Sequence, residues 1–483
     1  MKMLNGFANK LNTNYFQKVN GIPLADSGYA GVPTVTNFTD KVPGAWLFVE
    51  SAWVFQKTDG TSRLFAVDKF NGDIQELTTT STWTDRSGAA YAVDNWTMCQ
   101  FGDQTIACSI GNTTQVATTG NFGALAGSPP KAKFCCTQGL TVFLAHYNDG
   151  TLYQDGWWAS DTGDATTWTP SASNDAAYGR LLQTPGPITG MVSFRNKVYL
   201  FKESSFYVAE YVGYPVIWQV SVVDYSIGAS QNGAILNCGD CIIFGNRSGF
   251  YKFDGQSVQK IATVDVQSTY YSIYNGYRYE SSYYDEIFGI AYFGGGVGSN
   301  LLFYNKLSDS WGFGTGDSTY TYRFVRGNTS AYSSDLPGSN GPLYHPSFFY
   351  EDTTPTSGQR IGQLVIGSSG SVTVSSTTFG GPLAMTTWRK ATPVFIGVNG
   401  TTPTLGTMSI WTGKAPIYNS YPLSLDTVLA GSATATAAPT YSSNITPRYD
   451  FLVTGRYMQY QVTISNITAL YDIVVDGIPA GAE

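Results

Sequence analysis

Short runs of alternating apolar and polar residues, separated by turn residues, recur through the middle of the chain. The clearest lies within residues 233–262, where strands are expected at 234–238, 241–244, 249–253 and 257–262. The pairs Gly239-Asp240 and Asp254-Gly255 provide two of the intervening turns. Four short strands joined by tight turns predict an antiparallel meander of the size of one β-propeller blade.

The segment before this meander repeats its pattern. Strands are expected at 197–201 and 206–208, and the pair Phe206-Tyr207 recurs as Phe250-Tyr251, 44 positions later. Four-stranded blades repeat at about 40–50 residues, and a single blade cannot bury both of its faces alone. Weaker copies are expected at 53–77, 95–118, 141–158 and 283–304. The chain is therefore predicted to be all-β, with a β-propeller of about six four-stranded blades over residues 46–315.

The pattern changes on both sides of the predicted propeller. Residues 1–45 show little periodicity and are predicted to be an N-terminal arm or contact segment. Residues 316–444 are predicted to be a loop-rich β tip or insertion. Within them, 338–341, 367–380 and 430–443 are rich in Gly, Ser, Thr or Ala and are expected to be loops. Strands are expected at 393–398, 407–411, 457–464 and 471–475, and residues 445–483 are predicted to be C-terminal strands that close the fold.

The composition supports this fold class. Aromatic residues make up 15% of the chain and charged residues only 13%, about half of the usual ~25%. Long surface helices normally carry many Glu, Lys and Arg. Aromatic side chains instead fit pleated sheets, and the 53 glycines fit tight turns.

The net charge of −7 is relevant to nucleic-acid binding. Proteins that hold nucleic acid by its phosphates need a basic face, and this sequence has no run rich in Lys or Arg. Sequence-reading DNA or RNA binding is therefore not expected. A mildly acidic wall would let DNA pass through a channel without sticking, and the same charge is also ordinary for a soluble protein of this size.

The N-terminus lacks the apolar core of a signal peptide, and no apolar run approaches the ~20 residues of a membrane span. The chain is therefore expected to fold in the cytosol, without a membrane span. Cys238 and Cys241 form a C-x-x-C motif, which can indicate redox or zinc chemistry. A second such motif or a paired histidine motif is missing from the sequence, so the two cysteines are interpreted as flanking a hairpin turn.

Candidate catalytic groups are few. Any Ser-His-Asp triad must use His146 or His345, and both are interpreted as loop or hairpin-end residues. The enzymatic alternative is a sialidase-like glycosidase, because segment 160–168 resembles an Asp box with altered spacing. Glycoside hydrolysis requires paired acids, or an acid beside a tyrosine nucleophile. The candidates for such a site are Glu280, Tyr283, Tyr284 and Glu286.

Several phrases, taken in order, resemble the tail hub or nozzle proteins of short-tailed bacteriophages, also called packaged-DNA stabilisation proteins. The phrases are Trp158-Ala159-Ser160-Asp161, Gly163-Asp164, Thr167-Trp168-Thr169-Pro170, Gly186-Pro187-Ile188-Thr189-Gly190, Val198 to Phe201, Ser205-Phe206-Tyr207, Tyr211-Val212-Gly213, Gly249-Phe250-Tyr251, Phe253-Asp254-Gly255, Gly455-Arg456-Tyr457 and Asp476-Gly477-Ile478-Pro479-Ala480-Gly481. The likeness extends over 46–315 and from 445 to the end, and leaves out the N-terminal arm and residues 320–440.

This resemblance implies a non-enzymatic structural protein of the virion tail, assembled in the host cytoplasm without cofactor or metal. It implies a hexamer below the portal and adaptor rings, with tail fibres or tailspikes as further partners. The lumen would be the exit channel for double-stranded DNA and would retain packaged DNA until ejection. The alternative function is a glycan-binding or glycan-hydrolysing propeller, such as a receptor-binding tail protein.

Overall fold

Antiparallel β-strands joined by short turns form most of the described chain. The computed structural model describes residues 16–25, 28–31, 34–37, 49–68, 71–79, 82–262, 266, 281–286, 288–294, 300–315, 323–327, 347–351, 359–365, 371–376, 379–380, 385–397, 402–413, 434–437, 439–442, 445–455 and 457–480. Within these ranges there is no helix of the length and apolar character needed to span a membrane.

Six four-stranded blades follow one another along the chain, each an antiparallel meander. Blade A contains β5 (Val49–Gln56), β6 (Ser62–Asp68), β7 (Ile74–Thr79) and β8 (Thr82–Asp85). Blade B contains β9 (Thr97–Phe101), β10 (Gln104–Cys108), β11 (Gln115–Ala117) and β12 (Gly123–Ala124). Blade C contains β13 (Lys131–Gln138), β14 (Thr141–Asn148), β15 (Leu152–Ala159) and β16 (Ala177–Arg180). Blade D contains β17 (Ile188–Phe194), β18 (Lys197–Lys202), β19 (Phe206–Gly213) and β20 (Ile217–Asp224). Blade E contains the 3-10 turn η1 (Asn232–Ala234), β21 (Ile235–Asn237), β22 (Ile242–Asn246), β23 (Gly249–Phe253) and β24 (Val258–Lys260). Blade F contains β25 (Ser281–Asp285), β26 (Ile290–Gly294), β27 (Asn300–Asn305) and β28 (Ser310–Thr315).

A seventh blade, blade G, completes the ring from two distant parts of the chain. It contains β29 (Arg323–Gly327), β30 (Ser347–Glu351), β31 (Gln359–Val365) and, as its outer strand, β4 (Thr34–Asn37). Strand β4 pairs with β31 in antiparallel register, with Val35 opposite Leu364. The chain then continues into β5, the inner strand of blade A, so the first and last blades are held together by the N-terminal strand.

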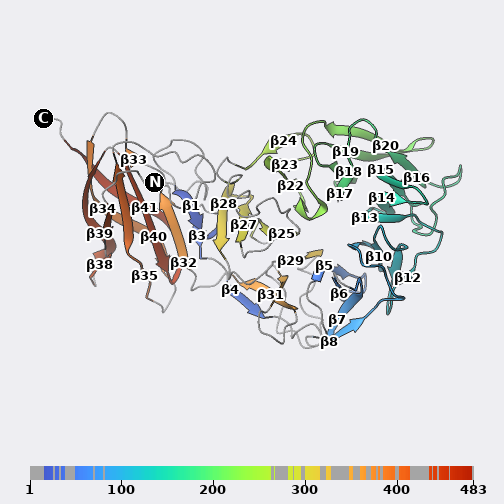
Figure 1. Cartoon of the computed structure of the whole chain (residues 1–483), viewed down its shortest axis with the longest axis horizontal. Coiled ribbons are helices and arrows are strands. Elements are labelled where there is room, and N and C mark those ends of the chain that lie inside the picture. The colour runs from blue at the N-terminus through green and yellow to red at the C-terminus, as the bar shows by residue number, and fades with distance from the viewer. Residues whose placement is uncertain are drawn as a thin grey trace.

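The inner strands of the seven blades surround a common axis, as the right-hand part of Figure 1 shows. They contact one another in the order β5, β9, β13, β17, β21, β25 and β29, and β29 contacts β5 again. This last contact is a parallel pairing in which Val325 lies opposite Ala52. The propeller is thus a closed ring of seven blades.

Aromatic side chains fill the spaces between adjacent blades. Between blades D and E, Phe206 packs against Phe201 with ring centroids 5.0 Å apart and against Phe244 at 5.6 Å. Phe206 and Phe250 each lie near the start of the third strand of their blade. The repeat of this pair in the sequence therefore reflects equivalent positions in two neighbouring blades, as the sequence predicts.

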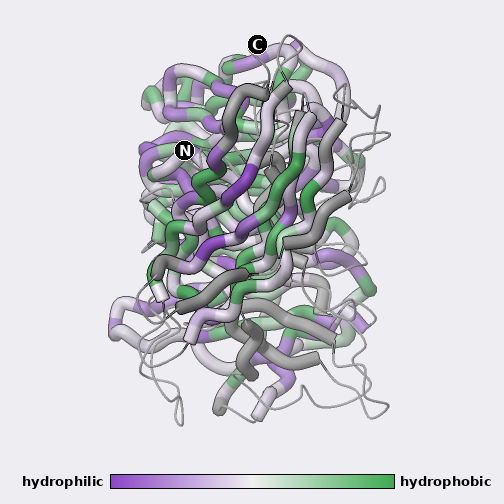
Figure 2. Tube along the Cα trace, turned by 90° about the vertical axis from the view of Figure 1, so that its left-hand side faces the viewer, coloured by the Kyte–Doolittle hydropathy of each residue, from purple (hydrophilic) through white to green (hydrophobic). Residues whose placement is uncertain are grey.

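The C-terminal part of the chain forms a β-sandwich beside blade F, on the left of Figure 1. One sheet contains β1 (Phe16–Asn20), β32 (Ser371–Ser376), β40 (Tyr457–Ser465), β36 (Met408–Gly413) and β37 (Thr434–Ala437), with β33 (Phe379–Gly380) and β35 (Thr404–Leu405) also paired to β40. The other contains β2 (Ile22–Pro23), β3 (Tyr29–Ala30), β41 (Ile467–Ala480), β34 (Met385–Gly397), β39 (Ile445–Gly455) and β38 (Pro439–Ser442). Strand β40 buries Met458, Tyr460, Val462 and Ile464 between the sheets. Figure 2 shows hydrophobic positions interspersed with more hydrophilic ones along the front strands.

Residues 16–31, here called the strap, connect the sandwich to the propeller. Strand β1 lies between β28 of blade F and β32 of the sandwich, and β3 pairs with β41. Asn305 Nδ2 donates to the Pro23 carbonyl at 3.0 Å, and the Tyr29 hydroxyl donates to the Trp311 carbonyl at 3.2 Å. The strap therefore bonds to blade F and to both sheets of the sandwich.

The predicted all-β propeller is confirmed, and its six predicted units correspond to blades A to F. The sheets do not follow the expected boundaries at residues 45, 315 and 444, because strands from 16–37 and 323–365 pair over long distances. The propeller closes through β4, whereas residues 445–480 form sandwich strands.

Two of the expected loops, 367–380 and 430–443, were wrong, because they contain β32, β33, β37 and β38. In β32, Val372 and Val374 are buried and alternate with Ser371 and Thr373, which is strand periodicity despite the Gly-rich surroundings. Residues 338–341 lie outside the described residues.

Candidate functional site

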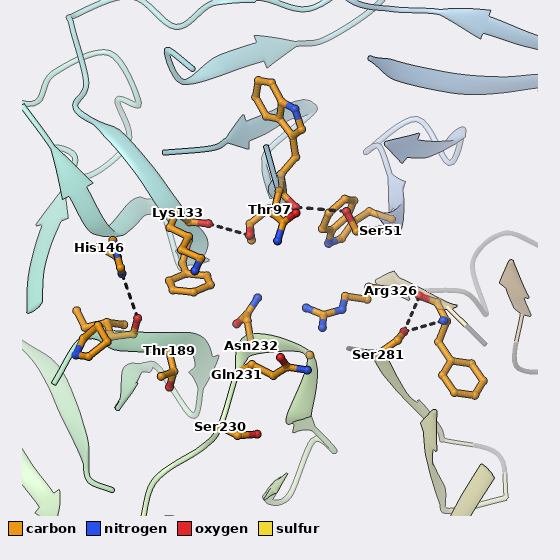
Figure 3. A pocket seen from close by; sticks show the side chains of 18 residues that line it. Ser51, Thr97, Lys133, His146, Thr189, Ser230, Gln231, Asn232, Ser281 and Arg326 are labelled. Carbon is orange, nitrogen blue, oxygen red and sulfur yellow. Dashed lines mark hydrogen bonds between the residues drawn. The ribbon is translucent and has the colours of Figure 1, made fainter. Parts of the chain in front are cut away.

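A cavity lies on the propeller axis, with a volume of about 260 Å³. We call it the axial cavity. All seven blades line it, through Ser51, Thr97, Lys133, Thr189, Ser281 and Arg326 on inner strands and through Gln231 and Asn232 just before β21 (Figure 3). The described residues that line it include two cationic side chains, Lys133 and Arg326, but neither an aspartate nor a glutamate.

Many of the polar side chains around the axial cavity join one blade to the next. Ser51 Oγ donates to the Trp96 carbonyl, and Thr97 Oγ1 donates to the Lys133 carbonyl at 3.0 Å. Thr189 Oγ1 donates to the Ala229 carbonyl at 2.7 Å. These bonds hold blade A to B, B to C, and D to the start of E. Their hydroxyl groups thus have a structural role in the ring.

On the other side of the cavity, Ser282 Oγ donates to the Gly233 carbonyl at 2.5 Å, which joins blade F to blade E. The Phe324 amide donates to Ser281 Oγ at 2.6 Å, which joins blade G to blade F. Blades G and A are joined by the parallel strand pair. These contacts between blades do not account for the charged and amide side chains of the cavity, Lys133, Arg326, Gln231 and Asn232.

His146 lies at the edge of the axial cavity, where blade C meets blade D. Its Nδ1 donates to the Ile188 carbonyl at 3.3 Å, and its φ of +53° is in the left-handed region. Burial lowers the pKa of His146, and the charge of Lys133 lowers it further, against the opposing effect of the Ile188 hydrogen bond. The imidazole is therefore neutral at pH 7. His345 lies outside the described residues.

Arg326 brings a partly buried guanidinium to the cavity. Burial lowers its pKa to about 10, so it remains charged at neutral pH. In the part of the chain that the structure describes, the Arg326 side chain has neither a hydrogen-bond acceptor nor a carboxylate partner. A partly desolvated charge without a partner is costly, so this position calls for a functional explanation.

The candidate glycosidase residues do not converge in the described structure. Tyr283 packs beside Tyr292 and Phe324, whereas the neighbouring Tyr284 lies on the opposite face of the strand with Lys306 Nζ 5.1 Å from its ring centroid. Glu286 is exposed in the turn after β25. Glu280 lies outside the described residues. The two tyrosines therefore do not form one nucleophile site.

The segment that resembles an Asp box forms the loop between β15 and β16. Thr166 and Thr167 donate hydroxyl hydrogen bonds to Asp164 at 2.6 and 2.8 Å. Trp168 is buried, and its carbonyl accepts a bond from Trp158 Nε1 at 2.8 Å. These contacts are internal to blade C and give the loop a structural role.

The cysteine motif is a hairpin, as the sequence predicts. The Cys238 amide donates to the Cys241 carbonyl at 2.8 Å, and Asn237 pairs with Ile242. Gly239 in the turn has a φ of +80°, a conformation that favours glycine. Burial raises the pKa of the Cys238 thiol well above its usual value. No cluster of potential metal ligands is present among the described residues.

Two groups of exposed apolar side chains lie at opposite ends of the molecule. The hairpin patch consists of Tyr211, Val212, Tyr214 and Val216 on the β19–β20 hairpin, and Tyr214 is 77% exposed. The sandwich patch consists of Val394, Ile396, Leu452 and Val474 on the adjacent strands β34, β39 and β41, and Leu452 is 76% exposed. Figure 1 places β34, β39 and β41 at the left end of the molecule and β19 and β20 at the upper right of the propeller.

The comparisons with known proteins found similar solved structures only at low sequence identity. No protein-family model matches the sequence, and no curated protein matches it. A structure of YCF48 bound to D1 peptide covers 74% of this chain and 97% of its own, with 11% identity and a TM-score of 0.38. YCF48 from Cyanidioschyzon merolae covers 68% and 98%, with 10% identity and a TM-score of 0.40. Apo AztD from Citrobacter koseri covers 67% and 88%, with 10% identity and a TM-score of 0.39.

Proposed function

We propose that this chain is a structural assembly protein, the ring-forming subunit of a bacteriophage tail nozzle. The observation that carries the proposal is the pair of exposed apolar patches at opposite ends of the long axis. Large exposed apolar surfaces mark interaction sites in soluble proteins, and aromatic residues are enriched at such interfaces. The hairpin patch exposes two tyrosines, a residue type that is enriched at such interfaces.

The position of the patches favours a ring over a simple dimer. A two-fold dimer uses one self-complementary surface, whereas a larger ring needs two different surfaces on each subunit, one for each neighbour. The hairpin patch and the sandwich patch would supply those two surfaces. The resemblance to tail hub proteins supports a hexamer placed below the portal and adaptor.

The proposed partners follow from this position in the tail. The ring would bind portal or adaptor proteins on one side and tail fibres or tailspikes on the other. Double-stranded DNA would pass through the lumen between subunits, where a net charge of −7 per chain gives little attraction for phosphate. The closed β-rings of the subunits would resist the pressure of packaged DNA.

Introducing negative charge into the hairpin patch tests the proposed interface. We expect the wild-type chain to join adaptor-bearing particles and form rings in negative-stain images, and the double variant Tyr214→Glu/Val216→Glu to remain monomeric while keeping the wild-type circular dichroism spectrum. Val93→Glu is the matched control, because Val93 is 61% exposed and lies outside both patches. Normal ring formation by the double variant would overturn the proposed interface.

A second experiment tests the role in the tail. Particles that lack the chain should lose their packaged DNA, so full and stable heads in its absence would contradict a nozzle. Specific binding of the purified chain on a glycan array, without association with adaptor-bearing particles, would favour the glycan-binding alternative.

A further inference from the structure

We propose that the axial cavity of the propeller binds a small oxyanion that carries phosphate or carboxylate groups. This role goes beyond the assembly function and does not depend on it. The first argument is charge. Lys133 and Arg326 point two cationic groups toward a cavity whose described lining contains no acidic side chain, in a chain that is acidic as a whole.

The fold provides partners for two buried cations elsewhere in the propeller. Arg63 donates two hydrogen bonds to Glu76, from Nε at 2.6 Å and from Nη2 at 3.0 Å. Lys202 Nζ donates to the carbonyls of Leu181 and Thr184 at 2.7 and 2.6 Å. Arg326 differs, because no described residue accepts a bond from its guanidinium. A bound anion would supply the missing partner.

Neutral donors lie beside the two cations. Asn232 Oδ1 accepts a hydrogen bond from the Met191 amide at 3.2 Å, which leaves Nδ2 as a donor, and Figure 3 shows this nitrogen directed toward the open centre. Gln231 Nε2 is buried and lacks a hydrogen-bond partner among the described residues. Unpaired buried donors are rare in folded proteins, and a ligand is one ordinary explanation for them.

These groups match oxyanion chemistry. A planar guanidinium donates two parallel hydrogen bonds to a carboxylate or phosphate, and an ammonium adds a point charge. The donors come from blades C, E and G, so they approach from three directions around the axis. The volume of about 260 Å³ is many times the ~30 Å³ share of one water molecule, so the cavity can hold a compact di- or trivalent anion.

The experiment titrates the purified full chain with inorganic phosphate, citrate and chloride at matched ionic strength, using isothermal titration calorimetry and thermal unfolding. We expect saturable binding of phosphate or citrate at one site per chain, with a higher unfolding temperature, and no such effect of chloride. The stronger of the two ligands distinguishes a phosphate source from a carboxylate source. If neither binds saturably at millimolar concentration, the proposal is wrong.

Variants locate the site. Arg326→Met and Lys133→Met, on opposite blades, should each weaken binding at least about tenfold, the effect expected when one charge-assisted hydrogen bond is lost. Arg448→Met is the matched control, since Arg448 pairs with Asp450 on the sandwich and should bind like the wild type. Unchanged affinity in both cavity variants would overturn the assignment.

The unfolding temperature measured without ligand is a second readout, which can be obtained even if the variants bind no anion. Removing an unpaired, partly buried charge should raise the unfolding temperature of Arg326→Met above that of the anion-free wild type, and phosphate or citrate should no longer raise it further. A variant that unfolds at a lower temperature but still gains stability from the anion would contradict the role of Arg326.

Discussion

Glu76 is a buried carboxylate shared by two guanidiniums in blade A. Arg63 binds it through two hydrogen bonds, and Arg86 Nε donates to the same carboxylate at 2.6 Å. Arg63 Nη2 also donates to the Gly120 carbonyl of blade B. The carboxylate therefore neutralises two charges and positions a contact between blades.

Replacing this carboxylate should be strongly destabilising. In Glu76→Gln the two guanidiniums face each other without a counter-charge, and we expect a loss of about 3–5 kcal/mol in the free energy of unfolding, measured by urea denaturation with tryptophan fluorescence. Glu210→Gln breaks the exposed ion pair with Lys197 and should cost no more than about 1 kcal/mol. Equal effects of the two substitutions would show that burial does not matter here.

The cavity residues illustrate what a sequence can predict at this scale. His146 was singled out because histidine is scarce, yet Lys133, Gln231, Asn232 and Arg326 carry no motif. They meet only because they lie on, or just before, the first strands of three different blades, C, E and G. The polar residue at the start of each repeat unit would have been a useful signal for the axial cavity.

At the scale of elements, blades A to F were predictable because each is local. Their turns carry their own signals, such as Gly102, whose φ of +57° allows the tight turn between β9 and β10. Blade G was missed because its strands are separated by long segments and its fourth strand comes from the N-terminus. Pairing between distant segments leaves no local pattern of turns.

The closure of the ring can be tested by a cross-link. Val35 lies opposite Leu364 in the β4–β31 pair, so Val35→Cys/Leu364→Cys places two thiols at directly opposed positions. Opposed residues in antiparallel strands are about 5 Å apart at Cα, within the range for a disulfide. We expect the oxidised variant to unfold at a higher temperature than its reduced form.

The control for this cross-link shifts one cysteine by a single position. In Thr36→Cys/Leu364→Cys the cysteines are one residue out of register, and successive strand positions alternate between the two faces of a sheet, so a disulfide should not form. Efficient cross-linking of the shifted pair, and not of the opposed pair, would mean that the register of β4 is different.

At the scale of the whole molecule, the strap makes the propeller and sandwich depend on each other. Its strands pair with blade F and with both sandwich sheets. We expect the intact chain to unfold in one calorimetric transition, and a chain lacking residues 1–31 to unfold in two, because the two parts would then lose their shared strands. Removing only residues 1–15 keeps the strap and should leave a single transition. Two transitions in the intact chain would contradict this coupling.

The long-range pairing of the N-terminal strands has a consequence for synthesis on the ribosome. Strands β3 and β4 emerge before blades A to F, but β4 pairs with β31 and β3 with β41, which both emerge much later. Blades A to F can fold in order as they emerge, since their strands pair locally. Strand β3 can pair early with β2, but its other edge and β4 lack their partners, and stay exposed to wrong ones, until β41 and β31 have emerged.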